Sequence, residues 1–215
     1  MTPWWRCDMN KSWRLRDHHR FLLKELMEHL EFVESKMARL EQVIGEHLRP
    51  FEEEVQRLRT IPGVDWVTAG GLIAEIGVKM EQFGDAEHLS SWAGLCPGSY
   101  ETAGKRKSGK TRKGSAWLRR CLCQGAWAIS TKRGNYLSAQ FRRLAARRGK
   151  KRAIIAVAHS LLQIAFYILR DRKCYRELGA DYFDQLHPNR VKRYLVKRLE
   201  RLGFQVSLEP AAQPV

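Results

Sequence analysis

Residues 153–170, AIIAVAHSLLQIAFYILR, decide the fold of this 215-residue chain. Apolar side chains lie on nearly every side of the helix that this segment predicts, and such a helix must be buried among other elements. We therefore expect it to form the centre of a helical domain. Its histidine, His159, is expected to be a hydrogen-bonded core residue rather than a catalytic group, because buried polar side chains are normally paired.

Helical patterns flank this central segment on both sides. Glycines and small polar residues exclude a regular helix in the stretch before about Ser115, and the one candidate strand is residues 204–208. The expected fold class is therefore mainly all-α, with a long N-terminal coiled-coil helix pair followed by a helical domain that contains a helix-hairpin-helix and a basic Gly-rich loop. Further helices are expected within 83–97 and at 115–130, 136–147 and 189–202.

The apolar positions from about Ser12 to Leu58 follow a heptad seam. Successive members are separated alternately by three and four residues, which is the spacing of a coiled coil. Pro50 is expected to kink or restart the helix, because it cannot donate a backbone hydrogen bond. Self-association is favoured over packing on the same domain or in an antiparallel hairpin, since so long a seam has no obvious partner within the chain. Its members are Leu23, Leu26, Leu30, Val33, Met37, Leu40 and Ile44.

Residues 60–77, TIPGVDWVTAGGLIAEIG, predict two helices joined by a tight turn at Pro62-Gly63. This is the pattern of a helix-hairpin-helix, in which backbone N–H groups at the start of the second helix hold a phosphate without reading base sequence. The predicted phosphate contacts are the backbones of Gly63, Val64 and Asp65. The alternative is a plain helical turn without a ligand.

The chain carries a formal net charge of +16, and its pI is about 10.0. This balance favours a polyanionic partner, either nucleic acid or an anionic membrane surface. The charge is concentrated in residues 98–152, which contain 17 Lys/Arg against a single acid, Glu101. An ordinary solvated surface mixes both signs, so we expect this segment to neutralise nucleic-acid phosphates. The candidate nucleic-acid-binding residues are Lys105, Arg106, Lys107, Lys110, Arg112, Lys113, Arg119, Arg142, Arg143, Arg147, Arg148, Lys150, Lys151 and Arg152.

Three aromatic residues lie near these basic residues in the sequence: Trp127, Tyr136 and Phe141. Their position on predicted helices favours core packing over stacking on bases. Gly104, Gly109 and Gly114 are expected to let the basic loop approach a duplex closely, because glycine has no side chain.

The five cysteines form no C-x-x-C pair, and their odd number favours a reducing compartment over a disulfide framework. Cys121 and Cys123 have no ligand spacing that supports a metal site. No apolar run reaches the length of a membrane span, and the N-terminus has no signal-peptide core. We therefore expect a cytoplasmic protein without a membrane partner.

Four blocks of the sequence together resemble one protein family. The blocks are IPGVDWVTAGGLIAEIG, WAGLCPGSYETAGKRKSGKTRKGSAWLRR, RRLAARRGKKRAIIAVAHSLL and YRELGADYF, and their order and spacing match as well. The chain resembles the C-terminal transposase domain, with its coiled coil, of the bridge-RNA-guided insertion-sequence transposases, the IS one-ten family (IS116/IS110/IS902-type). The resemblance covers roughly residues 12–210.

The resemblance implies a protein of two parts. In that family an N-terminal RuvC-like domain carries four acidic residues that bind divalent metal, and the C-terminal domain supplies a serine nucleophile that attacks DNA. A coiled coil joins the two and helps dimerisation, while a structured RNA pairs with donor and target DNA. The implied partners are DNA, a structured guide RNA and further copies of the chain joined through the coiled coil.

This chain departs from the family pattern in two respects. It starts at the coiled coil, so we expect the RuvC-like domain to be absent and Mg²⁺ to be needed only by that missing domain, with no cofactor in this chain. The nucleophile motif resembles P-G-x-x-E-S-A-G, whereas residues 97–104 read PGSYETAG and place Thr102 at the serine position.

Threonine keeps the nucleophilic hydroxyl but adds a methyl group, which restricts χ1 and crowds an in-line attack on phosphorus. Ser99 is an alternative nucleophile, but it does not align with the family position. A turn-stabilising role is favoured for Ser99. Thr102 is therefore the candidate catalytic residue.

The sequence thus predicts a DNA-binding transposase of an insertion sequence, acting in DNA transposition and recombination by attack of Thr102 on a DNA phosphodiester. The alternative is a catalytically dead remnant that binds DNA or guide RNA, or co-assembles with full-length transposase. A third hypothesis is a basic protein that coats nucleic acid generally. The expected parts are an unstructured leader (1–11), the coiled coil (12–59), a transposase domain (60–180, with the helix-hairpin-helix at 60–77, a basic active-site loop at 97–115 and a helical core at 115–170) and a C-terminal basic helix and tail (181–215).

Overall fold

The computed structural model describes residues 16–96, 100–108, 111–186 and 188–209. The expected leader at 1–11 and two candidate residues, Ser99 and Lys110, therefore lie outside the described residues. The chain divides into two compact units, of which the first ends at Pro50 and the second begins at Phe51.

The first unit is built on one long helix, α1 (Asp17–Leu48), of 32 residues. Its heptad positions are open to solvent, as shown by the 64% and 61% exposed side chains of Leu26 and Leu40. A short 3-10 helix, η1 (Arg49–Phe51), interrupts the pattern at Pro50, as predicted. The long helix is therefore confirmed, whereas pairing through its apolar seam stays a prediction.

The second unit is mainly helical, which confirms the expected fold class. Helix α2 lies in the segment expected to be coiled coil, yet it packs on α3 and α7 within this unit. The helices predicted at 115–130, 136–147 and 189–202 are confirmed with small shifts at their ends. The elements in order are α2 (Glu52–Arg59), α3 (Trp66–Ile76), η2 (Met80–Phe83), α4 (Ala86–Trp92), β1 (Tyr100–Thr102), β2 (Lys105–Ser108), α5 (Ala116–Thr131), α6 (Tyr136–Arg148), α7 (Lys150–Asp171), α8 (Tyr182–Leu186) and α9 (Pro188–Glu200).

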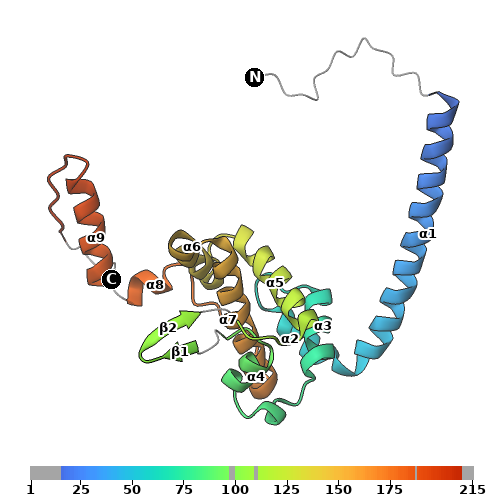
Figure 1. The fold of residues 1–215 in the computed structure, drawn as a ribbon, viewed down its shortest axis with the longest axis horizontal. Coiled ribbons are helices and arrows are strands. Elements are labelled where there is room, and N and C mark those ends of the chain that lie inside the picture. Colours follow the sequence, from blue (N-terminus) through green and yellow to red (C-terminus); the bar gives the residue numbers. More distant parts are fainter. Residues whose placement is uncertain (1–15, 97–99, 109–110, 187, 210–215) are drawn as a thin grey trace, which may run out of the picture. The chain divides into compact units, whose positions relative to one another are not determined.

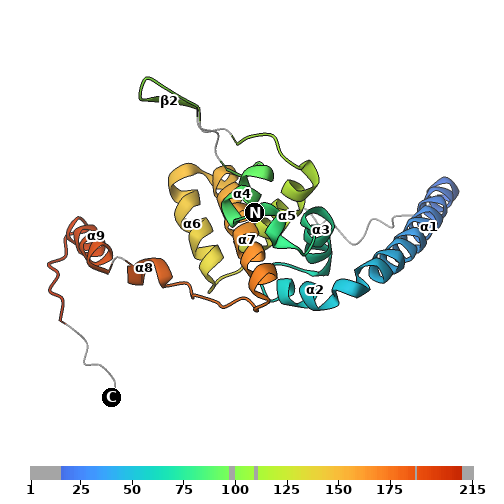
Figure 2. The same cartoon turned by 90° about the horizontal axis from the view of Figure 1, so that it is seen from below.

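Helix α7 is the centre of this unit, as its apolar sequence predicts. It packs against α2, α4, α5 and α6, and in both ribbon views α5 and α6 lie beside it (Figure 1, Figure 2). Leu161 and Leu162 are fully buried, and Phe166 is 1% exposed. Among the described helices, α7 is long and apolar enough to cross a membrane, but 56% of its apolar window is buried in the domain, so core packing accounts for its hydropathy.

Side-chain caps fix where several of these helices begin. The carboxylates of Asp65 and Asp85 accept backbone N–H groups at the starts of α3 and α4, at 2.8 and 2.7 Å. Ser115 and Asn135 do the same for α5 and α6, at 3.1 and 2.7 Å. A cap satisfies a backbone donor that the helix itself leaves unpaired. These four residues therefore set the positions at which α3, α4, α5 and α6 begin.

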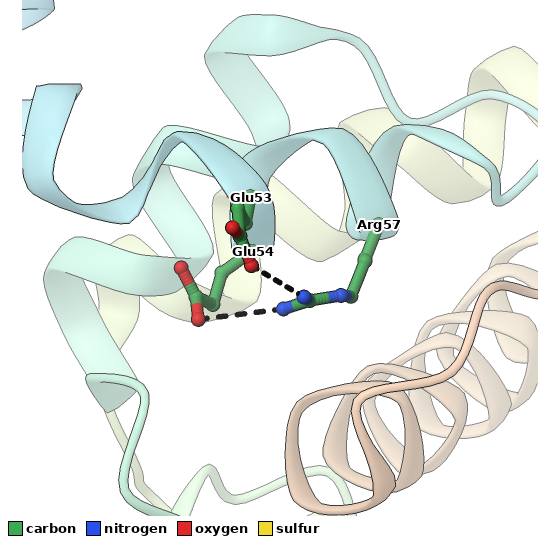
Figure 3. Close-up of polar contacts among 3 residues, drawn as sticks. All are labelled: Glu53, Glu54 and Arg57. Carbon is green, nitrogen blue, oxygen red and sulfur yellow. Dashed lines mark hydrogen bonds and ion pairs between the residues drawn. The ribbon is translucent and has the colours of Figure 1, made fainter.

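Helix α2 has 8 residues, too few to be stable without packing. Its Val55 and Leu58 are fully buried. On another face, Arg57 pairs with Glu53 at 2.6 Å and with Glu54 at 3.4 Å (Figure 3). Such ion pairs near the surface contribute little to stability, so burial of the two apolar side chains is what holds α2 in place.

The stretch predicted to be an irregular basic loop contains an antiparallel β-hairpin. Strands β1 and β2 pair with Thr102 opposite Lys105 and Glu101 opposite Arg106. The two residues between the strands, Ala103 and Gly104, both have positive φ, at 50° and 72°, as in the tight hairpin turns that match the strand twist. The candidate strand at 204–208 was wrong, because these residues form no regular secondary structure.

Candidate nucleic-acid interface

The two backbone segments that flank the hairpin cross each other at a pair of glycines. A Cβ atom on Gly114 would lie 2.3 Å from the carbonyl carbon of Ala93, and one on Gly94 would lie 2.7 Å from the carbonyl oxygen of Arg112. Gly94 also has φ of +67°. No side chain fits at either position, so Gly114 serves close packing within the chain, whereas the sequence suggested close approach to a duplex.

Arg119 on α5 holds this crossing together. Its Nη2 donates to the carbonyl oxygen of Gly94, to Thr111 Oγ1 at 3.0 Å and to the carbonyl oxygen of Arg112 at 3.1 Å. The guanidinium therefore ties the chain before the hairpin to the chain after it. Arg119 is one of the predicted nucleic-acid contacts, but its Nη2 donates to three acceptors within the protein, which gives it a positioning role.

A second polar contact fixes α5, which carries Arg119. Ser115 Oγ donates to Glu75 Oε2 on α3 at 2.7 Å while it accepts the backbone N–H of Leu118 at 3.1 Å. The start of α5 is thus joined to α3, and the same helix holds Gly94 and Thr111 on either side of the hairpin. Sequence reasoning missed Glu75 and Gly94, since neither stands out by residue type or by local spacing.

Cys96 precedes the hairpin and meets the central helix. Its Sγ lies 3.8 Å from Nε2 of His159 on α7. Burial raises the pKa of the Cys96 thiol, as does the Glu87 carboxylate, while Arg112 acts in the opposite direction. Burial lowers the pKa of His159, against a smaller opposing effect of Glu87. A neutral imidazole beside a neutral thiol fits the core role expected for His159.

Thr102 lies at the end of β1, directly before the hairpin turn. The pairing register sets its backbone opposite Lys105, and Arg106 and Lys107 follow along β2. Arg112 and Lys113 come after the hairpin, and both are exposed. The hairpin and its flanks thus carry Thr102 and a first group of basic residues; we call this group the hairpin cluster, and it comprises Lys105, Arg106, Lys107, Arg112 and Lys113.

A second basic cluster surrounds the junction of α6 and α7, where Gly149 with φ of +82° separates the helices. All its members are exposed, and none forms an ion pair with a carboxylate in the described residues. Two have neutral partners: Arg142 donates to Ser138 Oγ at 3.2 Å, and the Arg143 guanidinium lies 5.3 Å from the Phe183 ring centre. We call it the junction cluster; it comprises Arg142, Arg143, Arg147, Arg148, Lys150, Lys151 and Arg152.

The turn between α2 and α3 packs on α5. A Cβ on Gly63 would lie 2.6 Å from Ile129 Cγ1, and Val64 is only 6% exposed. The Asp65 carboxylate already occupies the start of α3, where its hydrogen bonds with Thr68 lower the pKa of Asp65. A carboxylate at this position opposes a bound phosphate. The predicted phosphate contact of these backbones stays a prediction, and the packing gives Gly63 a structural role.

Residues 175–183 attach the C-terminal segment to α6. Glu177 Oε1 accepts the backbone N–H groups of Tyr136 and Gly179 at 2.7 and 2.9 Å. The Tyr136 ring stacks on Phe183 with centroids 5.1 Å apart and meets Tyr182 edge-on at 5.2 Å. Packing within the chain, favoured for Tyr136 from sequence, is therefore observed. Phe141 is also buried, whereas Trp127 is 49% exposed.

The chain is similar in sequence to known transposases. A sequence model of the family described as "Transposase IS116/IS110/IS902 family" matches residues 55–142, which run from α2 through the hairpin into α6. The chain is 31% identical over 159 residues to a probable family 20 transposase of Pseudomonas aeruginosa, covering 72% of this chain and 46% of the relative. It is 32% identical over 132 residues to the transposase for insertion sequence element IS1111A of Coxiella burnetii, covering 58% and 35%.

A third relative, the transposase for insertion sequence element IS1328 of Yersinia enterocolitica, is 33% identical over 106 residues, covering 49% of this chain and 31% of the relative. These sequence matches identify the helical domain as an insertion-sequence transposase domain. The chain belongs to the IS116/IS110/IS902 transposase family. It spans less than half the length of each of these relatives.

Replacing Gly63 tests the packing of the α2–α3 turn. Gly63→Ala should lower the free energy of unfolding by about 1–2 kcal/mol for the positive φ and by about 1–3 kcal/mol more for overpacking against Ile129. Gly134→Ala is the matched control, because Gly134 has φ of +85° but nothing within 4 Å of its Cβ position. Denaturant unfolding followed by circular dichroism measures both; equal losses would contradict the packing role.

The lowered pKa of His159 predicts a pH dependence of stability. The folded state binds fewer protons than the unfolded state once the pH falls below the unfolded value of 6.5, so stability is lost in acid. His159→Gln removes this proton uptake. Between about pH 7 and about pH 5 the wild type should therefore lose more unfolding free energy than the variant. Parallel losses in the two proteins would refute a half-buried imidazole that is neutral in the folded state.

Proposed function

We propose that this domain binds nucleic acid through its two basic clusters and acts in DNA transposition by an insertion sequence, with Thr102 as the attacking group. The observation that carries the proposal is the uncompensated charge of residues 98–152, where 17 basic residues accompany one acid. No described carboxylate pairs with any member of the junction cluster. Such a surface gains free energy by releasing the counterions of a nucleic acid.

The position of the junction cluster argues for an anionic ligand. Lys150, Lys151 and Arg152 occupy the first turn of α7, where the helix dipole is already positive. Cations at this end of a helix destabilise it, so the three residues oppose the stability of the helix on which the fold is centred. A phosphate bound beside them would reverse that cost, because anions are favoured at helix N-termini.

The chemistry proposed for the hairpin is phosphoryl transfer to a hydroxyl. Thr102 Oγ1 attacks phosphorus, a threonine phosphoester forms, and the bond from phosphorus to a deoxyribose oxygen breaks. The proton of the threonine hydroxyl is released to a base, and the departing oxygen takes up a proton. Lys105 and Arg106, which follow the turn, neutralise charge on the phosphoryl oxygens as it builds.

The described residues do not fit the metal that the resemblance implies. They contain no group of three or more His, Cys, Asp or Glu side chains that could hold an ion. No step of the proposed chemistry is therefore routed through Mg²⁺ in this part of the chain. We assign the Mg²⁺ requirement to the acidic RuvC-like half that the resemblance implies.

Two further partners belong to the proposal. The exposed seam of α1 supports pairing with another copy of the chain, because apolar side chains in 3-4 spacing gain stability only when a second helix covers them. A structured guide RNA would take the role of reading sequence, which fits a domain whose basic residues offer contacts to phosphate rather than a pattern specific to bases.

A covalent adduct tests the chemistry. The chain is incubated with labelled duplex DNA that spans an end of the insertion sequence and is nicked to trap the intermediate. Denaturing electrophoresis should show a protein–DNA adduct that falls to background in Thr102→Ala. Thr102→Ser should increase the adduct, because it removes the crowding methyl group while it keeps the hydroxyl.

The same experiment separates the proposal from its alternative. If wild type and Thr102→Ala bind the DNA equally and neither forms an adduct, the chain is a binding module that lacks chemistry. That outcome favours the remnant that binds nucleic acid or co-assembles with full-length transposase. An adduct that persists in Thr102→Ala would instead assign the attack to another residue.

Reversing one charge of the junction cluster should stabilise the protein and weaken binding together. Lys151→Glu is expected to raise the unfolding free energy by about 0.3–1 kcal/mol through the helix dipole. The same change should make the dependence of log K on log salt shallower, where K is the association constant for duplex DNA. The magnitude of the slope should fall by about 0.9, the value for one phosphate contact. Denaturation and fluorescence anisotropy measure the two effects.

Lys79→Glu is the control for that experiment, because it makes the same change of net charge at an exposed site that belongs to neither basic cluster. It should leave the salt slope nearly unchanged. Equal slopes for wild type and Lys151→Glu would remove the junction cluster from the interface.

A further inference from the structure

A cavity opens on the side of the domain where the C-terminal segment crosses α7. Its volume is about 390 Å³, within the range of small-molecule sites. The walls come from the C-terminal half of α7, from the first residue of α6 and from the segment that follows α7. Three tyrosines, Tyr136, Tyr167 and Tyr175, line it together with Ile164 and Ile168. Planar aromatic rings and aliphatic side chains thus dominate its surface.

Tyr175 contributes a buried polar atom to the cavity wall. Its hydroxyl oxygen is buried and has no hydrogen-bond partner in the described structure. Burial and the nearby Glu177 carboxylate raise the pKa of Tyr175 far above its ordinary value, so the hydroxyl stays protonated. The backbone of Tyr175 is held by Thr60, whose Oγ1 accepts its N–H at 2.9 Å. A buried hydroxyl without a partner is unfavourable, and a ligand with a polar edge would satisfy it.

The rim of the cavity carries free positive charge. Lys173 and Arg176 line it, both are exposed, and neither pairs with a carboxylate in the described part of the chain. The acids nearby are engaged elsewhere. Asp171 binds Arg170 at 2.7 Å, and Glu177 accepts two backbone N–H groups. The cavity therefore pairs an apolar aromatic interior with a cationic rim.

We propose that this cavity holds the base of an unpaired nucleotide, with the nucleotide's phosphate at Lys173 and Arg176. The inference rests on the proposed nucleic-acid binding and adds to it a site for one splayed base. Aromatic faces stack on any base, and the Tyr175 hydroxyl offers a hydrogen bond to the base edge. Arg170 lies 4.7 Å from the ring centre of Tyr167 and forms a cation–π contact with that ring.

The ligand of interest is a single unpaired nucleotide, so the experiment adds one to a duplex. Binding of a fluorescent DNA hairpin is compared with binding of the same hairpin carrying one bulged nucleotide, and an RNA pair is measured in parallel. The wild type should prefer the bulged form by about tenfold, the scale of one stacked base. The nucleic acid that shows this preference, DNA or RNA, is the one whose unpaired base enters the cavity.

Two variants assign the preference to the cavity. Tyr167→Ala removes a stacking face, and Tyr175→Phe removes only the hydroxyl and preserves the packing. Both should reduce the preference for the bulge and leave affinity for the perfect duplex unchanged. Trp117→Ala is the matched control, because Trp117 is an aromatic residue, 68% exposed, that does not line the cavity.

The outcomes separate this inference from the proposed function. Equal affinity for bulged and perfect hairpins, in DNA and in RNA, overturns the cavity as a base site while binding to the duplex stands. A preference that survives Tyr167→Ala and Tyr175→Phe, or that is lost equally in Trp117→Ala, also overturns it. Failure to bind any duplex at low salt contradicts the proposed function and overturns this inference with it.

Discussion

The contacts between Arg119 and the two chain segments that cross at Gly94 and Gly114 are the constraint on which the candidate site depends. The crossing is possible because neither glycine has a side chain, and it persists because one guanidinium donates to both segments. Through Ser115 and Glu75 the same helix is joined to α3. The segments that lead into and out of the basic hairpin are thereby anchored on a helical core.

Two parts of helix α7 have opposite effects on its stability. Helix α7 buries Leu161, Leu162 and Phe166 and so centres the domain, yet its first turn carries three cations that the helix dipole disfavours. A protein shaped for stability alone would place acids there. The conflict is resolved if the junction cluster binds phosphate. The proposed function therefore explains why cations occupy the first turn of α7, which the stability of the helix alone does not explain.

Much of the fold could be predicted because it depends on local sequence. Single segments of the sequence contain the apolar run of α7, the heptad spacing of α1 and the break at Pro50. The hairpin could not be predicted, because KRKS is a poor strand sequence and Ala103-Gly104 is a weaker turn signal than Asn-Gly. Arg119 looks like its basic neighbours in sequence. Only the contact with Gly94, 25 residues away, shows its role.

Hydrogen–deuterium exchange in Arg119→Ala tests the central claim most directly, namely that this clamp anchors the chain on both sides of the hairpin. The account predicts that amides of residues 93–96 and 111–114 lose protection in the variant, while those of buried α7 exchange as slowly as in the wild type. Unchanged exchange in residues 93–96 and 111–114 would show that these segments are held by other contacts. Equal loss of protection in α7 would show that Arg119 supports the whole domain rather than the site.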